Sequence, residues 1–417
     1  MSALAQHLLR LGHAVSGSDR QENEQTEKLR KLGATVTVGH TESAAEGAEL
    51  IVHTSAVSQN NCELIFAKQH GIPVILREEL LGTIFNGYQT RIAVCGTHGK
   101  TTVTAMIHHV LERCGVSHAA FIGGEYGGEN YFFGENVVVA EACEYNRSFL
   151  HLRPSICVCL NVEHDHPDCY PTPADTERAF KQMFAQSEKV VLPAKHKNLA
   201  KKPFVCGEDV FPKAIKVKDG CASFEVVCRG ESIGSVTLTV SGKHNACNAI
   251  AAVGAAHLLN LPMLQVLQAL HTFKGVDRRW TVTEGICTVV CDYAHHPTEI
   301  EAAMHTAKSI VKKGGRIICV FQPHTYSRTQ AFFRRFVDCF ALCDQVIYLP
   351  IYSAREKPIQ NVTSHELYKF AKLQGLNAKY CPNFQKATDY LRRVAKPDDI
   401  ILLVGAGDVN TLAESLR

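Results

Sequence analysis

The 417-residue sequence lacks the features that mark membrane, secreted and nucleic-acid-binding proteins. No apolar run reaches the roughly 20 residues that a membrane-spanning helix needs. The first residues, MSALAQHLLRLGHAV, have an amphipathic helical pattern with Arg10 inside it, and they lack the basic start and continuous apolar stretch of a signal peptide. The net charge of +3 is too small to suggest a nucleic-acid or membrane surface. We therefore expect a cytoplasmic protein with small-molecule partners, no bound nucleic acid and no membrane insertion.

The sequence also has no C-x-x-C pair, although it contains 17 cysteines. Several of them, such as Cys157 and Cys159 in ICVCL, lie in apolar runs typical of strands. Zinc is not favoured, because neither EHDH nor HHP offers four ligands at a recognised spacing. Reduced and mostly buried thiols are the better interpretation.

No internal repeat or low-complexity linker divides the chain, yet its length is too great for one ordinary core. Residues 2–85 alternate helix and strand in a doubly wound pattern, but the chain begins inside the helix that should follow a first strand and its glycine-rich loop. A second α/β segment begins near Arg91 and includes short strands, predicted to be antiparallel, between about 203 and 240. A third begins near 286. We expect two or three α/β domains, the first without its first strand.

The stretch CGTHGKTT, residues 95–102, follows the apolar run RIAV and predicts a strand, a glycine turn and a helix that opens at Lys100. Gly96 and Gly99 would let backbone N–H groups converge on phosphate oxygens. Lys100 would bridge the β and γ phosphates, and Thr101 would offer its hydroxyl to Mg²⁺. The loop is shorter than the common G-x-x-x-x-G-K-[ST] pattern, but its context favours nucleotide binding.

Polar residues follow two strands of the second segment, Glu141 after VVVA and His166 after ICVCL. A carboxylate and an imidazole beside the phosphate loop suit a second divalent ion. The alternative is that Glu141 and Glu144 are solvated and that His164 and His166 only hydrogen-bond a turn. Residue types alone leave both interpretations open.

The strands of the third segment end in DYAHHPTE and FQPHTYSRT, where ligands of open parallel sheets bind. The polar residues at these ends are Asp292, His295, His296, His324 and Arg328. Because a guanidinium binds both oxygens of a carboxylate, Arg328 is a candidate to hold a carboxylate substrate. A surface arginine that opens a helix fits the spacing equally well.

Taken in order, the motifs GTHGKTT, EACEYNRSFLHL, NVEHDHPDCY, GKHNACNA, DRRW, DYAHHPTEI, FQPHTYSRT and GAGD resemble those of the Mur ligases over essentially the whole chain. The resemblance implies a three-domain α/β architecture: a truncated Rossmann-like domain that binds a UDP-sugar (1–88), a central P-loop ATPase domain (89–284) and a C-terminal Rossmann-like domain that binds an amino acid (285–417). It also implies an ATP-dependent ligase that phosphorylates the lactyl carboxylate of UDP-N-acetylmuramate and joins it to L-alanine.

The resemblance carries residue roles with it. The loop residues Gly96, Thr97, His98, Gly99, Lys100, Thr101 and Thr102 would hold ATP, together with His244, Asn245 and Asn248. Thr101, Glu141 and His166 match the family's metal ligands for Mg²⁺, with Mn²⁺ as an alternative. The residues matched to catalysis are Lys100, His166, Arg279, His296 and Arg328.

The sequence departs from the family pattern at a few places. Trp280 stands where phenylalanine is usual, and Cys143 and Asn146 stand at usually acidic positions. About fifteen residues of a first strand and glycine-rich loop are expected upstream of Met1, either left out by a start codon assigned too far downstream or truly absent. Two alternative functions follow: a ligase that attaches recycled tripeptide, or a nucleotide-binding protein inactive as a ligase. We expect a monomer or weak homodimer.

Overall fold

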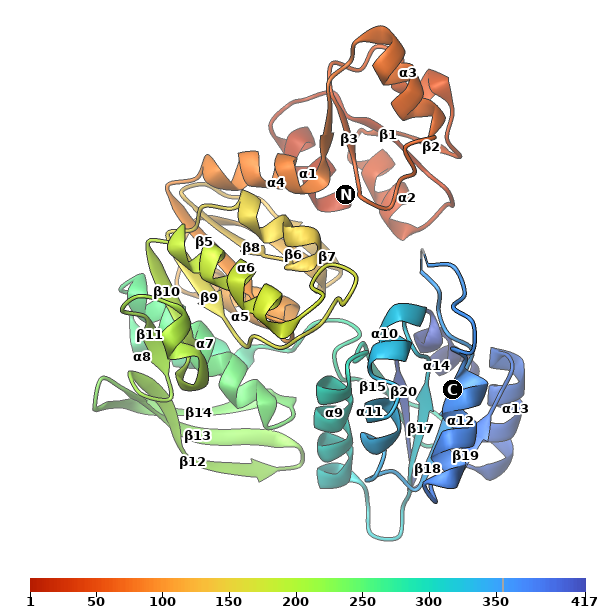
Figure 1. Ribbon diagram of the computed structural model, residues 1–417. Coiled ribbons are helices and arrows are strands. Elements are labelled where there is room, and N and C mark those ends of the chain that lie inside the picture. The colour runs from red at the N-terminus through yellow and green to blue at the C-terminus, as the bar shows by residue number, and fades with distance from the viewer. Residues whose placement is uncertain (355) are drawn as a thin grey trace.

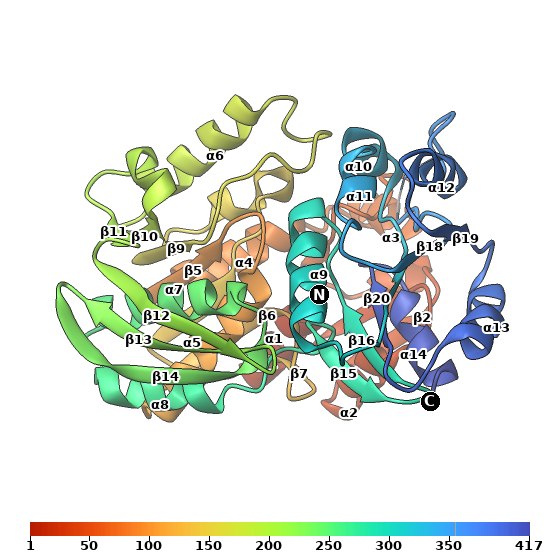
Figure 2. The same ribbon diagram turned by 90° about the horizontal axis from the view of Figure 1, so that it is seen from below.

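The computed structural model describes residues 1–354 and 356–417, which form three α/β lobes (Figure 1). The amino-terminal lobe lies at the top of Figure 1, the central lobe at the left and the carboxyl-terminal lobe at the lower right. Seen from below, helix α9 (Pro297–Ile310) of the third lobe lies at the junction with the central lobe (Figure 2). The predicted α/β class and three-part architecture are confirmed.

The amino-terminal lobe contains two separate pairs of parallel strands, β1 with β2 and β3 with β4. Asn side chains cap two of its helices, Asn23 at α2 and Asn61 at α3, as short polar residues do where the first N–H groups have no partner. The elements of this lobe are α1 (Ser2–Arg10), β1 (Ser16–Asp19), α2 (Glu24–Lys31), β2 (Thr35–Val38), the 3₁₀ helix η1 (Glu42–Ala45), β3 (Ile51–His53), α3 (Cys62–His70), β4 (Val74–Leu76) and α4 (Arg77–Asn86).

The central lobe is built on a ten-stranded sheet in the order β14-β13-β12-β11-β10-β9-β5-β8-β6-β7. Its elements are β5 (Thr90–Cys95), α5 (Lys100–Arg113), β6 (His118–Tyr126), β7 (Glu129–Phe132), β8 (Val137–Glu141), η2 (Tyr145–His151), β9 (Ile156–Cys159), α6 (Pro173–Ala185), β10 (Lys189–Pro193), η3 (Ala194–Leu199), β11 (Phe204–Cys206), β12 (Val210–Lys218), β13 (Cys221–Cys228), β14 (Glu231–Ser241), α7 (His244–Leu258) and α8 (Met263–Thr272).

Strands β12, β13 and β14 pair antiparallel, as predicted for residues 203–240. Strand β11 was expected to be antiparallel too, but it runs parallel to β10. The expectation was wrong because short strands of similar composition reveal their partners only through the connection between them. The 3₁₀ helix η3 lies in the connection between β10 and β11. This connection brings the chain back to the end of the sheet where β10 begins, so that β11 runs parallel to β10.

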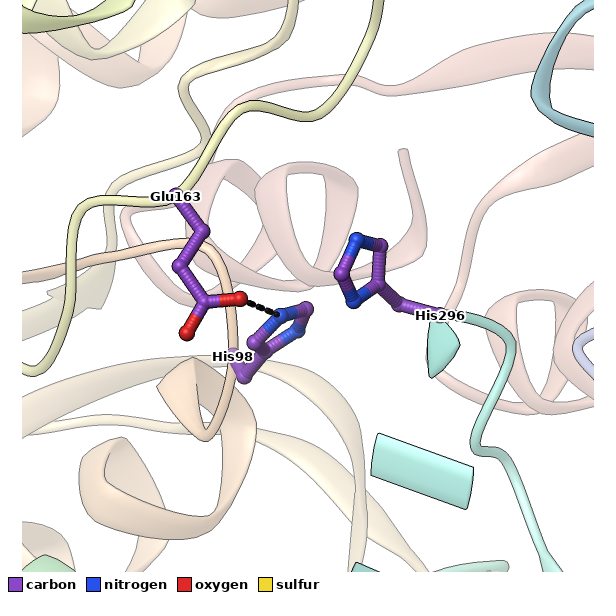
Figure 3. Close-up of side chains that lie close together, drawn as sticks. All are labelled: His98, Glu163 and His296. Atoms are coloured by element: carbon purple, nitrogen blue, oxygen red, sulfur yellow. Dashed lines mark ion pairs between the residues drawn. The ribbon is translucent and has the colours of Figure 1, made fainter. Parts of the chain in front are cut away.

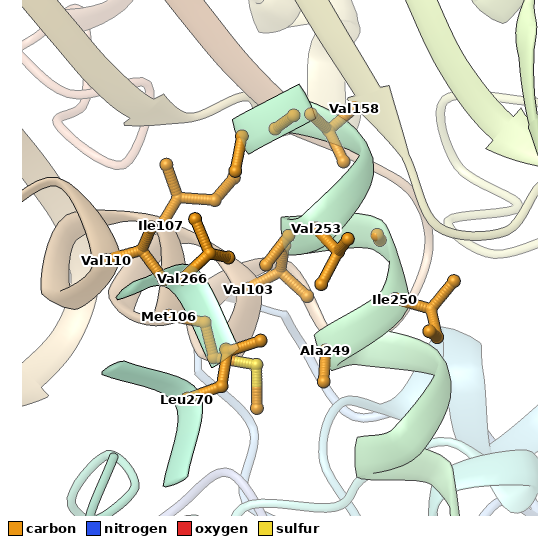
Figure 4. Close-up of a cluster of buried hydrophobic side chains, with 14 of the residues drawn as sticks. Val103, Met106, Ile107, Val110, Val158, Ala249, Ile250, Val253, Val266 and Leu270 are labelled. Atoms are coloured by element: carbon orange, nitrogen blue, oxygen red, sulfur yellow. The ribbon is translucent and has the colours of Figure 1, made fainter. Parts of the chain in front are cut away.

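One face of the central sheet is covered by α5, α7 and α8 (Figure 4). Val103 and Met106 of α5 meet Ala249 and Val253 of the alanine-rich α7 there, and all four are fully buried. A Cβ at Gly254 would lie 3.0 Å from a methyl carbon of Val191, so small residues let α7 approach the sheet. The prediction that alanine here serves close packing is confirmed.

The opposite face of the central sheet is covered by helices from two lobes. Leu4 of α1 and Phe85 of α4 are buried in the same cluster as Phe180 of α6. The His7 ring nitrogen Nδ1 lies 2.7 Å from the Tyr131 hydroxyl of β7. The first helix of the chain is therefore docked on the central lobe.

The carboxyl-terminal lobe holds a six-stranded sheet in the order β15-β16-β20-β17-β18-β19, parallel except at the edge strand β15. Its central strand IILLV, residues 400–404, is buried throughout, as expected of a parallel strand covered on both faces. The elements are β15 (Thr281–Glu284), β16 (Thr288–Asp292), α9, β17 (Ile317–Phe321), α10 (Tyr326–Ala331), α11 (Arg335–Asp338), β18 (Gln345–Tyr348), α12 (Ser364–Leu373), β19 (Ala378–Tyr380), α13 (Phe384–Val394), β20 (Ile400–Val404), η4 (Val409–Thr411) and α14 (Leu412–Ser415).

The domain division at residues 88 and 284 stays a proposal. Because β15 pairs with β16, hydrogen bonding argues for starting the third domain a few residues before 285. None of the helices in the described residues combines the length and apolar character needed to cross a membrane.

Candidate active site between the central and carboxyl-terminal domains

The phosphate loop leaves β5 and enters α5 through a turn that two glycines make possible. Gly96 has φ +130°, and a Cβ there would lie 3.1 Å from backbone atoms of Leu160 and Asn161. Gly99 has φ +84°, and its Cβ would lie 3.0 Å from the Asn248 Oδ1 atom. These backbone angles are in the left-handed region that side chains disfavour. The loop therefore needs glycine at both positions.

The segment after β9 holds the loop in place. The Asn161 side chain accepts from the His98 N–H at 2.8 Å and donates to the His98 carbonyl at 3.1 Å. The Thr97 hydroxyl accepts from the Glu163 N–H at 2.9 Å and lies 3.1 Å from the Glu163 carbonyl. Thr97 and His98, predicted as nucleotide contacts, thus also fix the loop to the neighbouring strand end.

Lys100 lies at the start of α5, with 12% of its side chain exposed. Its ammonium donates to Glu144 carboxylate oxygens at 2.8 and 3.1 Å and to the Gly96 carbonyl at 2.7 Å. Burial opposes the charge, but Glu144 more than offsets this effect and raises the pKa of Lys100 above its ordinary value. Lys100 is therefore a fixed cation at the centre of the loop.

The solvated alternative for Glu144 is wrong, since only 3% of this residue is exposed. Glu144 lies just beyond the end of β8, and the Tyr170 hydroxyl donates to its carbonyl. In the sequence, the only signal for Glu144 was its position three residues after Glu141. It could not distinguish a partner of Lys100 from a surface carboxylate.

The predicted metal ligands approach the loop from two strand ends. The Thr101 hydroxyl donates to a Glu141 carboxylate oxygen at 2.8 Å. His166 lies beside Glu144, with its Nε2 atom 3.9 Å from the nearer carboxylate oxygen. Burial is the main cause that lowers the pKa of His166, so its imidazole is neutral and has a lone pair to offer a metal.

His166 has φ +56°, an unusual backbone angle for a residue other than glycine. Thr325, which precedes α10, has φ +65° and is β-branched, which makes this angle rarer still. Strained backbone of this kind persists only where surrounding contacts fix it, and it concentrates at functional sites.

The amino-terminal end of α7 carries three predicted nucleotide contacts, of which Asn248 lies against the loop. His244 is exposed there, while the Asn245 amide donates to the Ser241 carbonyl at 2.7 Å. The Asn248 amide donates to Asn245 Oδ1 at 2.9 Å, and its own oxygen faces Gly99. Thr102, in the first turn of α5, is half-buried.

Arg328 on α10 reaches across the domain boundary. Its guanidinium donates two hydrogen bonds to Asp165, at 3.0 and 3.1 Å, and both side chains are about 5% exposed. The interpretation as a surface arginine is wrong. In this structure the fork holds a carboxylate of the protein itself, and the role of Arg328 toward a substrate carboxylate stays a prediction. Sequence reasoning gave no role to Asp165, which lies between His164 and His166.

A second cross-domain cluster gathers around His98 (Figure 3). The His98 ring nitrogens lie 3.4 Å from Glu163 and 3.4 Å from Glu299. Burial alone would lower the pKa of His98, but Glu299 and Glu163 together raise it to about 9. Arg279 approaches the same Glu299 carboxylate at 3.6 Å, and the His296 ring centre lies 4.5 Å from that of His98.

The ends of strands β16 and β17 provide further polar groups. Burial raises the pKa of Asp292 to about 6, although Arg279 and the N–H groups of Ala294 and Trp280 favour its charged form. Burial lowers the pKa of His295 to about 3 and that of His324 to about 4. These two imidazoles are neutral at physiological pH.

The departure at Cys143 adds no charge to the site. Burial raises the pKa of its thiol to about 12, helped by Glu144, so a neutral group stands where the family pattern has a carboxylate.

Three family models match the chain in succession. They are the Mur ligase family catalytic domain at residues 1–89, the Mur ligase middle domain at 94–256, and the Mur ligase glutamate ligase domain at 278–407. The resemblance inferred from the motifs is thereby confirmed.

Curated relatives and solved structures agree with these models. The UDP-N-acetylmuramate–L-alanine ligase of Caldanaerobacter subterraneus subsp. tengcongensis is 38% identical, over 99% of this chain and 94% of its own length. The namesake from Syntrophus aciditrophicus is also 38% identical, over 100% and 90%. The crystal structure of the Thermotoga maritima UDP-N-acetylmuramate–alanine ligase matches with a TM-score of 0.86 at 27% identity, covering 100% of this chain and 95% of that one. This chain belongs to the Mur ligase family.

Proposed function

We propose that the chain joins L-alanine to UDP-N-acetylmuramate at the expense of ATP, as a step in peptidoglycan precursor synthesis. The lactyl carboxylate oxygen attacks the γ-phosphorus and ADP leaves. The amine of L-alanine then attacks the acyl carbon, the amide forms, phosphate leaves and the ammonium proton is released. The curated relatives that align over nearly their whole length bear the name of this activity.

One structural observation supports the proposal: the residues predicted to bind phosphate and those predicted to bind a carboxylate face each other across one domain boundary. Lys100 and Thr101 lie on the central domain, His296 and Arg328 lie on the carboxyl-terminal domain, and Arg279 lies in the segment that connects them, just before β15. Asp165 and Glu163 join the two sides through direct contacts. A carboxylate and a triphosphate bound on opposite sides would meet there.

Lys100 is the residue that would stabilise the negative charge of the transferred phosphoryl group. A carboxylate is a poor electrophile, and phosphorylation gives it a leaving group. Charge builds on phosphate oxygens as the leaving oxygen departs, and a fixed ammonium is worth most where burial keeps water away. The Lys100 ammonium donates hydrogen bonds to Glu144 and to loop carbonyls, so it is already oriented toward the loop.

The side chains at the loop fit Mg²⁺. The Thr101 hydroxyl and a Glu141 carboxylate oxygen are hard oxygen donors that already lie 2.8 Å apart. When bound, the ion neutralises phosphate charge and aligns the phosphoryl oxygens. His166 offers nitrogen, which Mn²⁺ accepts more readily than Mg²⁺ does.

Arg328, His296 and Arg279 would orient the acceptor. Arg328 has a planar fork that suits the carboxylate of L-alanine, provided that the substrate shares or replaces Asp165. His296 lies between the loop and α9, where the acyl phosphate would form. Arg279 is stacked on Tyr293, 4.9 Å from the ring centre, which fixes its direction.

The test is phosphate release by the purified chain with ATP, Mg²⁺ and UDP-N-acetylmuramate, with and without L-alanine. Release that requires both acceptor substrates supports the ligase, and product mass identifies the amide. Parallel assays with glycine, L-serine and the recycling tripeptide define the amine. Tight ATP binding without acceptor-dependent release would refute the proposal and indicate a nucleotide-binding protein.

The location and assembly are part of the same proposal. The substrates are cytoplasmic small molecules, so we place the chain in the cytoplasm. We further propose that it is a monomer or weak homodimer. Sedimentation at micromolar concentration tests the assembly.

A further inference from the structure

Three side chains that are distant in sequence converge between the phosphate loop and the carboxyl-terminal domain. His98 comes from the loop, Glu163 from the segment after β9, and His296 from the turn before α9 (Figure 3). One ligand atom of each lies within 4.8 Å of the other two. Local spacing in EHDH and HHP argued against zinc, but the fold takes one residue from each of those motifs and adds His98.

The distances match metal ligands better than a hydrogen-bonded network. Ligands at 2.0–2.1 Å from a tetrahedral zinc ion lie about 3.3 Å from one another. The His98 Nε2 atom lies 3.4 Å from a Glu163 carboxylate oxygen. Yet the geometry between them does not meet that of a hydrogen bond, and Nε2 has no such partner among the described residues.

His296 adds an independent observation. Only 1% of this residue is exposed, and its Nε2 atom makes no hydrogen bond within the described part of the chain. Burial lowers the pKa of His296 to about 4, and the nearby His98 acts in the same direction. A buried, neutral imidazole with an unsatisfied nitrogen is costly unless it has a partner.

The surroundings resemble the outer shell of a metal site. Metal-bound histidine usually has its second ring nitrogen on a carboxylate, and His98 Nδ1 lies 3.4 Å from Glu299. Glu299 in turn accepts from the His295 N–H at 3.0 Å, and the Thr298 hydroxyl donates to Glu163 at 3.1 Å. Both carboxylates are therefore oriented by other groups.

We propose that His98, Glu163 and His296 bind one divalent ion of the zinc type, which bridges the phosphate loop and the carboxyl-terminal domain. Two imidazoles and one carboxylate leave the fourth position of a tetrahedral ion open, as in catalytic zinc sites. An oxygen of water, phosphate or carboxylate would occupy that position. The site is distinct from the magnesium site proposed at Thr101 and Glu141. It shares His98 and His296 with the proposed reaction site, but its test measures ion binding and not turnover.

Binding of the ion competes with protonation of His98. His98 must lose its proton to ligate, so affinity for the ion rises with pH. The charged groups around the ring are Glu163 and Glu299, with Arg279 at 3.6 Å from Glu299. Two carboxylates against one guanidinium leave the site negative enough for a dication once the proton is gone.

The experiment is a Zn²⁺ titration of the chelator-treated full chain against a chromophoric chelator, in millimolar Mg²⁺ so that the magnesium site is saturated. We expect one equivalent of Zn²⁺ that H98Q, E163Q and H296Q each weaken by more than about tenfold, and E299Q by about tenfold or more. H70Q, on an exposed helix end, and E141Q, at the magnesium site, are matched controls that keep the equivalent. Circular dichroism verifies that each variant is folded.

Co²⁺ bound to the wild-type chain provides a readout that needs no variant. Tetrahedral coordination by nitrogen and oxygen gives visible bands without the thiolate charge-transfer bands that cysteine ligands produce. Thiolate bands would assign the ion to some of the 17 cysteines and overturn the proposal. Absence of a tight Zn²⁺ equivalent, or one that H98Q leaves unchanged, would overturn it as well.

Discussion

The ion pair between Arg328 and Asp165 leads to a prediction about how the two domains stay together. The pair is bidentate, buried and spans the domain boundary. D165N removes the negative charge with little change in shape and leaves a guanidinium of which 4% is exposed. R328K keeps the positive charge but cannot reproduce two parallel hydrogen bonds.

The expected size follows from distance and burial. Two unit charges 3.0 Å apart attract by about 5.5 kcal/mol at an effective dielectric constant of 20. Removing one partner of a buried pair typically costs about 3–5 kcal/mol, because the other charge stays desolvated. The chain can avoid that cost if the domains separate and water reaches Arg328. We therefore expect D165N to open the interface before it unfolds either domain.

Two measurements separate opening from unfolding. Small-angle scattering reports the distance between domains. Urea unfolding can be followed through Trp280, the single tryptophan, which lies just before β15. In a cycle of D165N, R328Q and the double variant, we expect a coupling above about 1 kcal/mol in the opening equilibrium. Coupling below about 0.5 kcal/mol, with scattering unchanged in D165N, would refute the reasoning.

The pH dependence of this pair gives an internal control. Burial alone would raise the pKa of Asp165, but Arg328 dominates and holds it well below its ordinary value. A carboxyl with a depressed pKa stabilises the folded state above its unfolded pKa of about 3.9 and loses this only as pH falls through the lower folded value. The difference between wild type and D165N should thus be constant from pH 8 to pH 5.

Four further predictions concern the loop. K100M should lower turnover by about 100-fold or more, since a fixed charge on the phosphates is lost, while circular dichroism stays unchanged. G99A should abolish ATP binding in equilibrium dialysis because its Cβ meets Asn248 at 3.0 Å, and wild-type affinity there would contradict the loop geometry. E141Q should raise the Mg²⁺ concentration needed for half-maximal phosphate release, whereas E188Q, an exposed carboxylate paired with Arg91, should not. His98 has a folded pKa of about 9, above its unfolded value of about 6.5. The stability that its charged form contributes is therefore complete below pH 6.5 and is lost as pH rises through 9. The urea midpoint of the wild-type chain should fall over this pH range, and H98Q should flatten this pH dependence.

The strand, glycine turn and helix at residues 95–102 were predictable because everything this geometry needs is local. Gly96, Gly99, Lys100 and Thr101 lie within six residues that run from the end of a strand into the first turn of a helix, and each residue type has a chemical reason for its place. The parallel strands were recognisable for a similar reason, since runs such as IILLV are buried on both faces. Strand order was not predictable, because β11 joins the parallel part of the sheet through a connection that composition does not reveal.

The partners of the site residues were hidden because they depend on how the domains face each other. Arg328 and Asp165 are 163 positions apart, and no periodicity relates them. Glu299 shows the limit most clearly. In HHPTE it stands three residues after His296, the spacing of a capping box, and its carboxylate does accept from the N–H groups of His295 and His296. The same carboxylate also contacts His98 and Arg279, so one residue caps the start of a helix and joins two domains. Local chemistry explains the first role completely, and for that reason it gives no sign of the second.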